Sequence, residues 1–156
     1  MIKLEELDRR DFKAKDFYYS NTAELNKIDN TPKNFGILQC LLKTADKCQE
    51  IQDKLRDIDK NFKLKITSGF RCQEVNKLVN GSPISKHMQG LAVDLIIINK
   101  NPEQAMDLFL KTKIKFDKML VERGCVHVQF CLLEEKNRNL VGRAKLENGV
   151  WNVKYI

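Results

Sequence analysis

The longest regular pattern of hydrophobic residues in the chain has a helical period. Between residues 37 and 55, apolar side chains recur at steps of three and four, which is the spacing of one face of an amphipathic helix. The apolar positions are Ile37, Leu38, Leu41, Leu42, Ala45, Cys48, Ile51 and Leu55. The segment 32–58 is therefore predicted to form one long helix, with Thr31 directly before it and Pro32 at its first position.

Three shorter segments also have helical signals. They are NTAELNKI at 21–28, CQEVNKLV at 72–79 and NPEQAMDLFLKT at 101–112. In the last of these, Asn101 has the character of an N-cap and Pro102 stands at the first helical position, where the missing N–H costs nothing.

The remaining hydrophobic segments have the patterns of strands. FKLKITSGF at 62–70 alternates apolar and polar residues, and LAVDLIII at 91–98 is rich in β-branched residues. The segment 115–133 is predicted to form two strands joined by a turn at Arg123 and Gly124, and the tail is predicted to form a hairpin at Asn148 and Gly149. Together these elements predict an α+β fold in which N-terminal helices pack on a small antiparallel sheet.

Length and composition indicate one globular domain. The chain has 156 residues, 42% of them hydrophobic, which is enough to bury a core, so residues 1–156 are predicted to be a single domain and a monomer. No segment approaches the roughly 18 apolar residues that cross a bilayer, so no integral membrane segment is expected. The charged start MIKLEELDRRDFKAKDF lacks the apolar region of a signal peptide, which predicts synthesis in the cytoplasm.

The formal net charge of +7 favours an anionic partner. The lysines are scattered along the chain and no basic stripe is interleaved with aromatic residues, so a nucleic-acid partner is not expected. The five cysteines are odd in number and form no CxxC pair, which predicts free thiols, with Cys40 and Cys48 as small residues of the helix core.

The chain has only two histidines, and neither stands where packing favours a polar ring. His87 stands in a small polar loop, Asp94 interrupts the apolar strand that follows, and His127 interrupts the apolar strand CVHVQF. Buried ionisable groups are costly unless they are paired or bind a metal. Two histidines and an aspartate form a set that zinc accepts in catalytic sites. These residues alone leave open two interpretations, a metal site or hydrogen-bonded core side chains.

Several short stretches, in this order, resemble peptidase family M15, the zinc-dependent peptidoglycan peptidases of the D-alanyl-D-alanine carboxypeptidase type, which include many phage lysins. The stretches are SGFR at 68–71, NKLVNGS at 76–82, SKHMQGLAVD at 85–94 and VH at 126–127. The central stretch has the family pattern SxHxxGxAxD at every fixed position, and the whole resemblance covers about residues 16–131.

The resemblance implies roles for five residues. It implies that His87, Asp94 and His127 are the ligands of a catalytic Zn²⁺ ion. Arg71 corresponds to the arginine that the family places near the substrate, where a guanidinium can bind a carboxylate or stabilise an oxyanion. The alternative for Arg71 is a structural ion pair with Glu74 or Asp94. Ser85 is expected to contribute to substrate binding or to support a ligand.

The general base is the point at which this chain departs from the family. Many M15 enzymes have an acidic residue three positions before the last histidine, but Gly124 stands there. If Arg123 and Gly124 form a two-residue turn, Leu120 opposes His127, so Glu122 lies on the same face of the sheet as His127. Glu122 is therefore the predicted base, and Asp117 is predicted to point to the other face.

The resemblance implies a zinc peptidase that cleaves peptidoglycan stem or cross-link peptides, as a carboxypeptidase or an endopeptidase. It also implies that the protein is a lysin of a phage or prophage. Such an enzyme would act on the cell wall after release from the cytoplasm. The alternative is a non-catalytic wall-binding or interaction module that retains the metal site, an interpretation that Gly124 keeps open.

Overall fold

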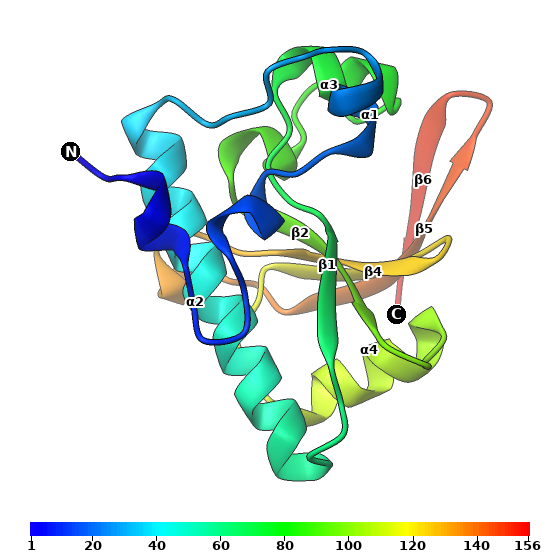
Figure 1. Cartoon of the computed structure of the whole chain (residues 1–156). Coiled ribbons are helices and arrows are strands. Elements are labelled where there is room, and N and C mark those ends of the chain that lie inside the picture. Colours follow the sequence, from blue (N-terminus) through cyan, green and yellow to red (C-terminus); the bar gives the residue numbers. More distant parts are fainter.

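The computed structural model describes residues 1–156 and contains four α-helices and one six-stranded sheet (Figure 1). The helices are α1 (Asn21–Leu25), α2 (Phe35–Ile58), α3 (Gln73–Leu78) and α4 (Pro102–Lys111). The strands are β1 (Leu64–Ser68), β2 (Ala92–Ile97), β3 (Lys118–Glu122), β4 (Cys125–Gln129), β5 (Leu140–Glu147) and β6 (Val150–Tyr155). The predicted α+β class is confirmed.

The sheet has the strand order β1-β2-β4-β3-β5-β6, and four of its five pairings are antiparallel. The exception is β5, which runs parallel to β3 over 140–143, so the prediction of a wholly antiparallel sheet is wrong for this pair. The reason is topological. β4 is already paired on both sides, and in the β3–β4 hairpin the end of β4 lies beside the start of β3. The connection that follows β4 therefore brings β5 to the start of β3, and β5 then runs beside β3 in the same direction.

The long helix starts later than its proline suggested. Asn34 is the N-cap of α2, and its Oδ1 accepts a hydrogen bond from Ile37 N at 3.2 Å. Upstream, the side chain of Asn30 donates to the carbonyls of Tyr18 and Phe70, which holds this part of the chain outside the helix. The prediction that Pro32 begins the helix is therefore wrong, because tertiary contacts take precedence over the local signal.

The capping prediction for α4 and both turn predictions are confirmed. Asn101 Oδ1 accepts from Gln104 N at 2.9 Å, and Pro102 is the first helical residue. Each predicted turn residue pair joins two antiparallel strands, β3 to β4 and β5 to β6, and the glycine of each pair, Gly124 or Gly149, has a positive φ.

The hydrophobic core lies between one face of the sheet and the helices α2 and α4. A cluster of 23 buried residues joins the two layers. Strand alternation supplies its sheet half, and the fully buried members there are Val93, Leu95, Met119, Val126 and Val128. The opposite face of the same strands is therefore free to carry other chemistry.

The N-terminal segment was not predicted to contribute to this core, but it does. Two 3₁₀-helices, η1 (Leu4–Leu7) and η2 (Ala14–Phe17), bury Leu7 and Phe17 completely.

Cys48 is buried as predicted, whereas Cys40 is only half-buried, and all five cysteines are unpaired. None of the helices has the combination of length and apolar character that spanning a membrane requires.

Candidate metal centre and catalytic cleft

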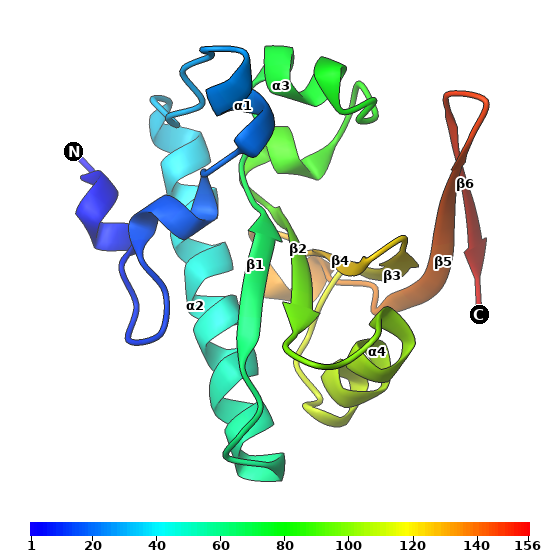
Figure 2. The same cartoon turned by 45° about the vertical axis from the view of Figure 1, so that its right-hand side comes forward.

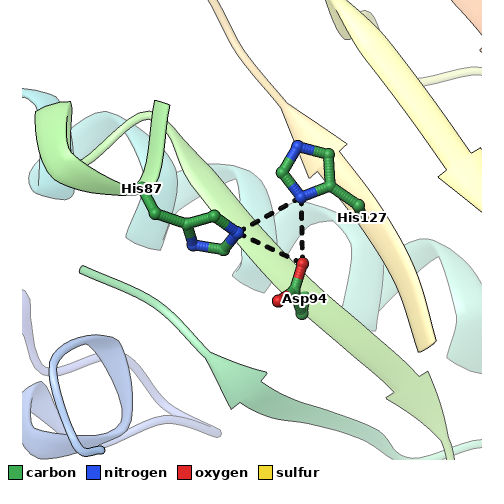
Figure 3. Close-up of side chains that lie close together, drawn as sticks. All are labelled: His87, Asp94 and His127. Carbon is green, nitrogen blue, oxygen red and sulfur yellow. Dashed lines mark hydrogen bonds and ion pairs between the residues drawn. The ribbon is translucent and has the colours of Figure 1, made fainter. Parts of the chain in front are cut away.

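Three buried side chains meet on the face of the sheet that α2 and α4 leave uncovered (Figure 3). His127 Nδ1 lies 2.9 Å from Asp94 Oδ1 and 3.2 Å from His87 Nε2, and His87 Nε2 lies 3.3 Å from Asp94 Oδ1. The three ligand-type atoms thus form a compact triangle, and the sequence-predicted ligand set is brought together in space.

Strand pairing explains why two of the three residues meet. In the register of the sheet, Asp94 on β2 stands directly opposite His127 on β4 and, on the other side, opposite Ser68 on β1. Residues directly opposite each other in neighbouring strands project to the same face at close range. The third residue, His87, comes from the 3₁₀-helix η3 (Lys86–Gln89), which immediately precedes β2.

Backbone contacts fix the position of His87. Its ring Nδ1–H donates to Gly69 O at 2.7 Å, and its backbone N–H donates to Ser85 Oγ at 3.2 Å. Gly90 ends η3 with φ +75°, and a Cβ at this position would lie 2.9 Å from Ile37 O. Only glycine combines this conformation with so close an approach to α2, so this glycine of the SxHxxGxAxD pattern is required by the local geometry.

The outer nitrogens of both imidazoles are used by oxygen acceptors, which decides what their inner nitrogens can do. His87 Nδ1 bonds Gly69 O, and His127 Nε2 donates to Gln129 Oε1 at 3.0 Å. When both rings are neutral, their inner nitrogens therefore present lone pairs toward the carboxylate Oδ1 of Asp94. Three acceptors this close together need a proton or a cation between them. This donor set fits a divalent metal ion, and the contacts of the outer nitrogens are those that orient metal-binding histidines.

The electrostatics of the three residues are consistent with this arrangement. Burial opposes ionisation of Asp94, but the two histidines hold its pKa well below the usual range. Burial lowers the pKa of His87. Burial acts in the same direction on His127, but the hydrogen bond and charge of Asp94 outweigh it and raise the pKa of His127. The centre therefore attracts positive charge to the position between His127 and Asp94.

Arg71 contacts the metal-ligand candidate Asp94 directly. Its Nη2 donates to Asp94 Oδ2 at 2.9 Å and its Nε donates to Ser68 Oγ at 3.1 Å, while Nη1 has no partner in the protein. Of the two ion pairs considered from the sequence, the one with Asp94 is present. Arg71 also lines the cleft, so its free Nη1 remains available for a bound molecule.

The turn that carries Arg71 depends on two contacts that sequence patterns did not indicate. Asn30 is buried, and its Oδ1 accepts from Cys72 N at 2.7 Å while its Nδ2 donates to Phe70 O at 2.9 Å. A Cβ at Gly69 would lie 2.2 Å from Phe17 O, so only glycine fits against the N-terminal segment here. The SGFR stretch is thus held by residues far away in the sequence.

Glu122 lies beside the metal-ligand candidates, as the parity argument predicted. The register pairs Leu120 with His127 and Glu122 with Cys125, which confirms the two-residue turn. A carboxylate oxygen of Glu122 lies within 4.8 Å of a carboxylate oxygen of Asp94, and the Glu122 side chain makes no hydrogen bond in the protein. Burial is the main cause that raises the pKa of Glu122 to about 6.

The geometry also explains why glycine at position 124 does not remove the carboxylate from the site. Gly124 has φ +84°, and a Cβ there would have no atom within 4 Å. A side chain at this tip of the β3–β4 hairpin would project into open space. An acidic side chain at position 124 would therefore point away from the metal-ligand candidates, whereas Glu122 lies beside them.

Asp117 is placed differently from the prediction. It lines the same cleft, because it precedes β3, where strand alternation does not yet apply. Both of its oxygens are used by Arg138, with Nε to Oδ1 at 2.7 Å and Nη2 to Oδ2 at 2.8 Å. The hydrogen bonds from Arg138 lower the pKa of Asp117. Asp117 therefore forms a structural ion pair with Arg138 and is not free to act as a base.

All these side chains open into one cleft of about 510 Å³. The predicted site residues that line it are Arg71, Ser85, His87, Asp94, Glu122 and His127. Gln129 and Trp151 line it too, and the sequence analysis missed both. Gln129 could have been found from its spacing, because it stands two positions after His127 on one strand and therefore shares its face.

Comparison with protein-family models gives a match. A family model described as Peptidase M15 matches residues 10–129 of the chain. No curated protein matches the sequence. The matched segment contains the three metal-ligand candidates, Arg71 and Glu122, and it covers most of the chain. The chain therefore belongs to the peptidase M15 family.

Proposed function

We propose that this protein is a zinc-dependent peptidase that hydrolyses peptide bonds in the stem or cross-link peptides of peptidoglycan. The observation that carries the proposal is the convergence of His87 Nε2, Asp94 Oδ1 and His127 Nδ1, three acceptor atoms within 3.3 Å of one another. Membership of the M15 family supports a peptidase, and generally a metal-dependent one.

The three residues would hold zinc through one nitrogen of each histidine and one oxygen of Asp94. Three protein ligands leave a further coordination position open, as in catalytic rather than structural zinc sites. Zinc bound there would supply a Lewis acid that polarises the substrate carbonyl and lowers the pKa of a water molecule.

Glu122 is the proposed general base. Its carboxylate is half-buried in the cleft and has no hydrogen-bond partner in the protein, so it is available to accept a proton from the attacking water. The same carboxyl group can then return that proton to the amine of the departing peptide. Its raised pKa of about 6 leaves it ionised near neutral pH yet basic enough to take the proton.

Arg71 and Ser85 are proposed to bind substrate. The Nη1 of Arg71 can donate to a terminal carboxylate or to the oxygen that becomes negative during the reaction. Its other nitrogens keep Asp94 and Ser68 in place. Ser85 accepts from the backbone N of His87, which leaves its hydroxyl proton free to bond a substrate carbonyl.

The place of action proposed here is the cell wall, reached after release of the protein from the cytoplasm, as for a phage or prophage lysin. The net charge of +7 favours adhesion to anionic wall polymers. The main support for a non-catalytic wall-binding module was Gly124, and the position of Glu122 beside Asp94 weakens that support.

Metal analysis combined with digestion of isolated peptidoglycan tests the proposal. The purified protein is expected to hold about one zinc ion and to release D-alanine or soluble peptides from sacculi. His87→Ala, Asp94→Ala and His127→Ala should each lose tight zinc binding, because a three-ligand site depends on each ligand. Zinc retained in all three variants would refute the metal site. Zinc binding without release from any peptidoglycan would favour the binding module.

A further inference from the structure

The β5–β6 hairpin lies outside the segment matched by the family model, yet it forms part of the cleft. β5 pairs with β3 only over 140–143, and beyond that point β5 and β6 pair only with each other. Figure 2 shows this hairpin standing at the end of the sheet, with its tip on the same side of the molecule as α3. The hairpin therefore projects past the strand that supports it.

Strand alternation gives the hairpin one apolar face toward the cleft. Ala144 pairs with Val153 and Leu146 pairs with Trp151, so these side chains share a face. Ala144, Val153 and Trp151 line the cleft, while Val150 is 61% exposed and has the opposite parity from Trp151. An apolar wall thus faces the metal-ligand candidates across the cleft.

Trp151 also joins the two sides of the cleft. Its indole Nε1–H donates to Asn80 O at 3.0 Å. Asn80 lies in the segment between α3 and η3 that also contributes Ile84 and Ser85 to the lining. The hairpin is therefore tied to the segment that leads into His87.

The register indicates how far the strand β6 lies from the metal centre. A single row crosses the sheet from His127 to Leu120, then to Gly142 and Tyr155 on β6. Neighbouring strands are about 4.8 Å apart and an extended peptide rises about 3.3 Å per residue, so the three steps, about 14 Å, correspond to about four residues. A dipeptide bound at the metal centre would not reach β6.

We propose that the β5–β6 hairpin is a substrate-binding wall and that Trp151 and Val153 determine specificity, binding a small aliphatic side chain several residues from the scissile bond. The inference rests on the proposed function and deepens it. Six apolar side chains line the cleft, alongside charged ones such as Lys118 and Arg138, and they are Val79, Ile84, Leu120, Ala144, Trp151 and Val153. Such a surface binds the methyl groups of alanine. The preferred substrate is then a peptide of four or more residues.

A series of synthetic alanine-containing stem-type peptides of two, four and six residues tests this preference. In the zinc-loaded parent, kcat/KM should rise about 10- to 100-fold from the shortest to the longest peptide, because remote contacts support the reaction at the bond that is cut. Trp151→Ala should lose most of this gain. Trp151→Phe, which keeps the ring and loses the bond to Asn80, should keep most of it. Val150→Ala, on the other side of β6, is the matched control and should behave as the parent.

Trp151 is the only tryptophan in the chain, which provides a readout independent of turnover. Titration of the metal-free protein with the six-residue peptide should change the tryptophan fluorescence, and Val153→Asp should weaken this binding at least about 10-fold. A parent that cuts peptides with no length preference, with Trp151→Ala unchanged, would overturn the wall and leave the proposed function intact. A fluorescence change without hydrolysis would support the wall and contradict the peptidase. If the peptide neither changes the fluorescence nor is hydrolysed, the proposed role of the hairpin as a substrate-binding wall is also refuted.

Discussion

The two faces of the central strands differ in chemistry although successive residues of the same strands supply them in alternation. On the helix-covered face, Leu95 of β2 and Val126 of β4 pair with each other and are fully buried. One position away, Asp94 and His127 pair with each other on the open face and are 6% and 8% exposed. The polar pair is therefore nearly as buried as the apolar one.

This contrast shows how the site is positioned. A shift of one residue in strand register would exchange the two faces, placing Asp94 in the apolar core and Leu95 in the cleft. Both changes are costly, so packing of the helix face fixes the register that brings the ligand candidates together. Stability resides in one face and chemistry in the other. Substitutions on each face should accordingly have separable effects.

The largest effect is expected on the open face, at Glu122. Glu122→Gln keeps the size of the side chain but cannot accept a proton, so kcat should fall about 10²- to 10⁴-fold while zinc content and thermal stability stay at parent values. Glu135→Gln, an exposed carboxylate outside the cleft, is the matched control. Parent-like turnover in Glu122→Gln would transfer the role of base to another group.

The pH dependence of the same reaction gives a further check on Glu122. Because its pKa is raised to about 6, the ionised form that acts as base predominates above that pH and disappears below it. The rate of the parent should therefore fall as the pH is lowered through about 6. The pH profile of Glu122→Gln should lack this limb.

The next largest effect is expected on the helix face, at Leu95. Leu95→Ala removes a fully buried side chain from the core cluster and should lower the free energy of unfolding by about 2–5 kcal/mol. The folded fraction should still bind zinc, since Asp94 and His127 are unchanged. Ile98→Ala, at an exposed position just after β2, should change stability by less than about 0.5 kcal/mol. Denaturant unfolding and zinc titration measure the two quantities.

A smaller effect is expected at Gln129, which lines the cleft and contacts the metal-ligand candidates through His127. Gln129→Ala removes the acceptor that orients the imidazole, and zinc affinity should fall about 10- to 100-fold with little change in stability. Competition with a chelator of known affinity measures the change, with Gln39→Ala on the exposed face of α2 as control. Unchanged affinity would mean that β4 alone orients His127.

The smallest effect is expected at the hairpin turn. Gly124→Ala should lower the free energy of unfolding by about 1–2 kcal/mol, because φ +84° is unfavourable for an L-residue and no neighbouring atom contributes a clash. Gly149→Ala places the same strain in the β5–β6 turn and should cost a similar amount. A stabilised Gly124→Ala variant would show that the turn is not left-handed and would reopen the register of Glu122.

The sequence by itself determined the elements whose signals are local. The helical period of α2, the Asn101 cap of α4 and the two glycine-containing turns each depend on residues within a few positions of one another. The parity that places Glu122 on the face of His127 followed from the turn alone, because a two-residue hairpin fixes the register of both strands. The ordered motif stretches also indicated the family and the three metal-ligand candidates.

Only the tertiary structure decided the features that depend on contacts between distant segments. The parallel pairing of β5 with β3 follows from which sheet edge is free once β4 has two neighbours. The contacts of Arg71 with Asp94, of Asp117 with Arg138 and of Trp151 with Asn80 join groups far apart in the chain. No local propensity encodes such pairs, because their energy arises only when packing removes the groups from water and brings them together.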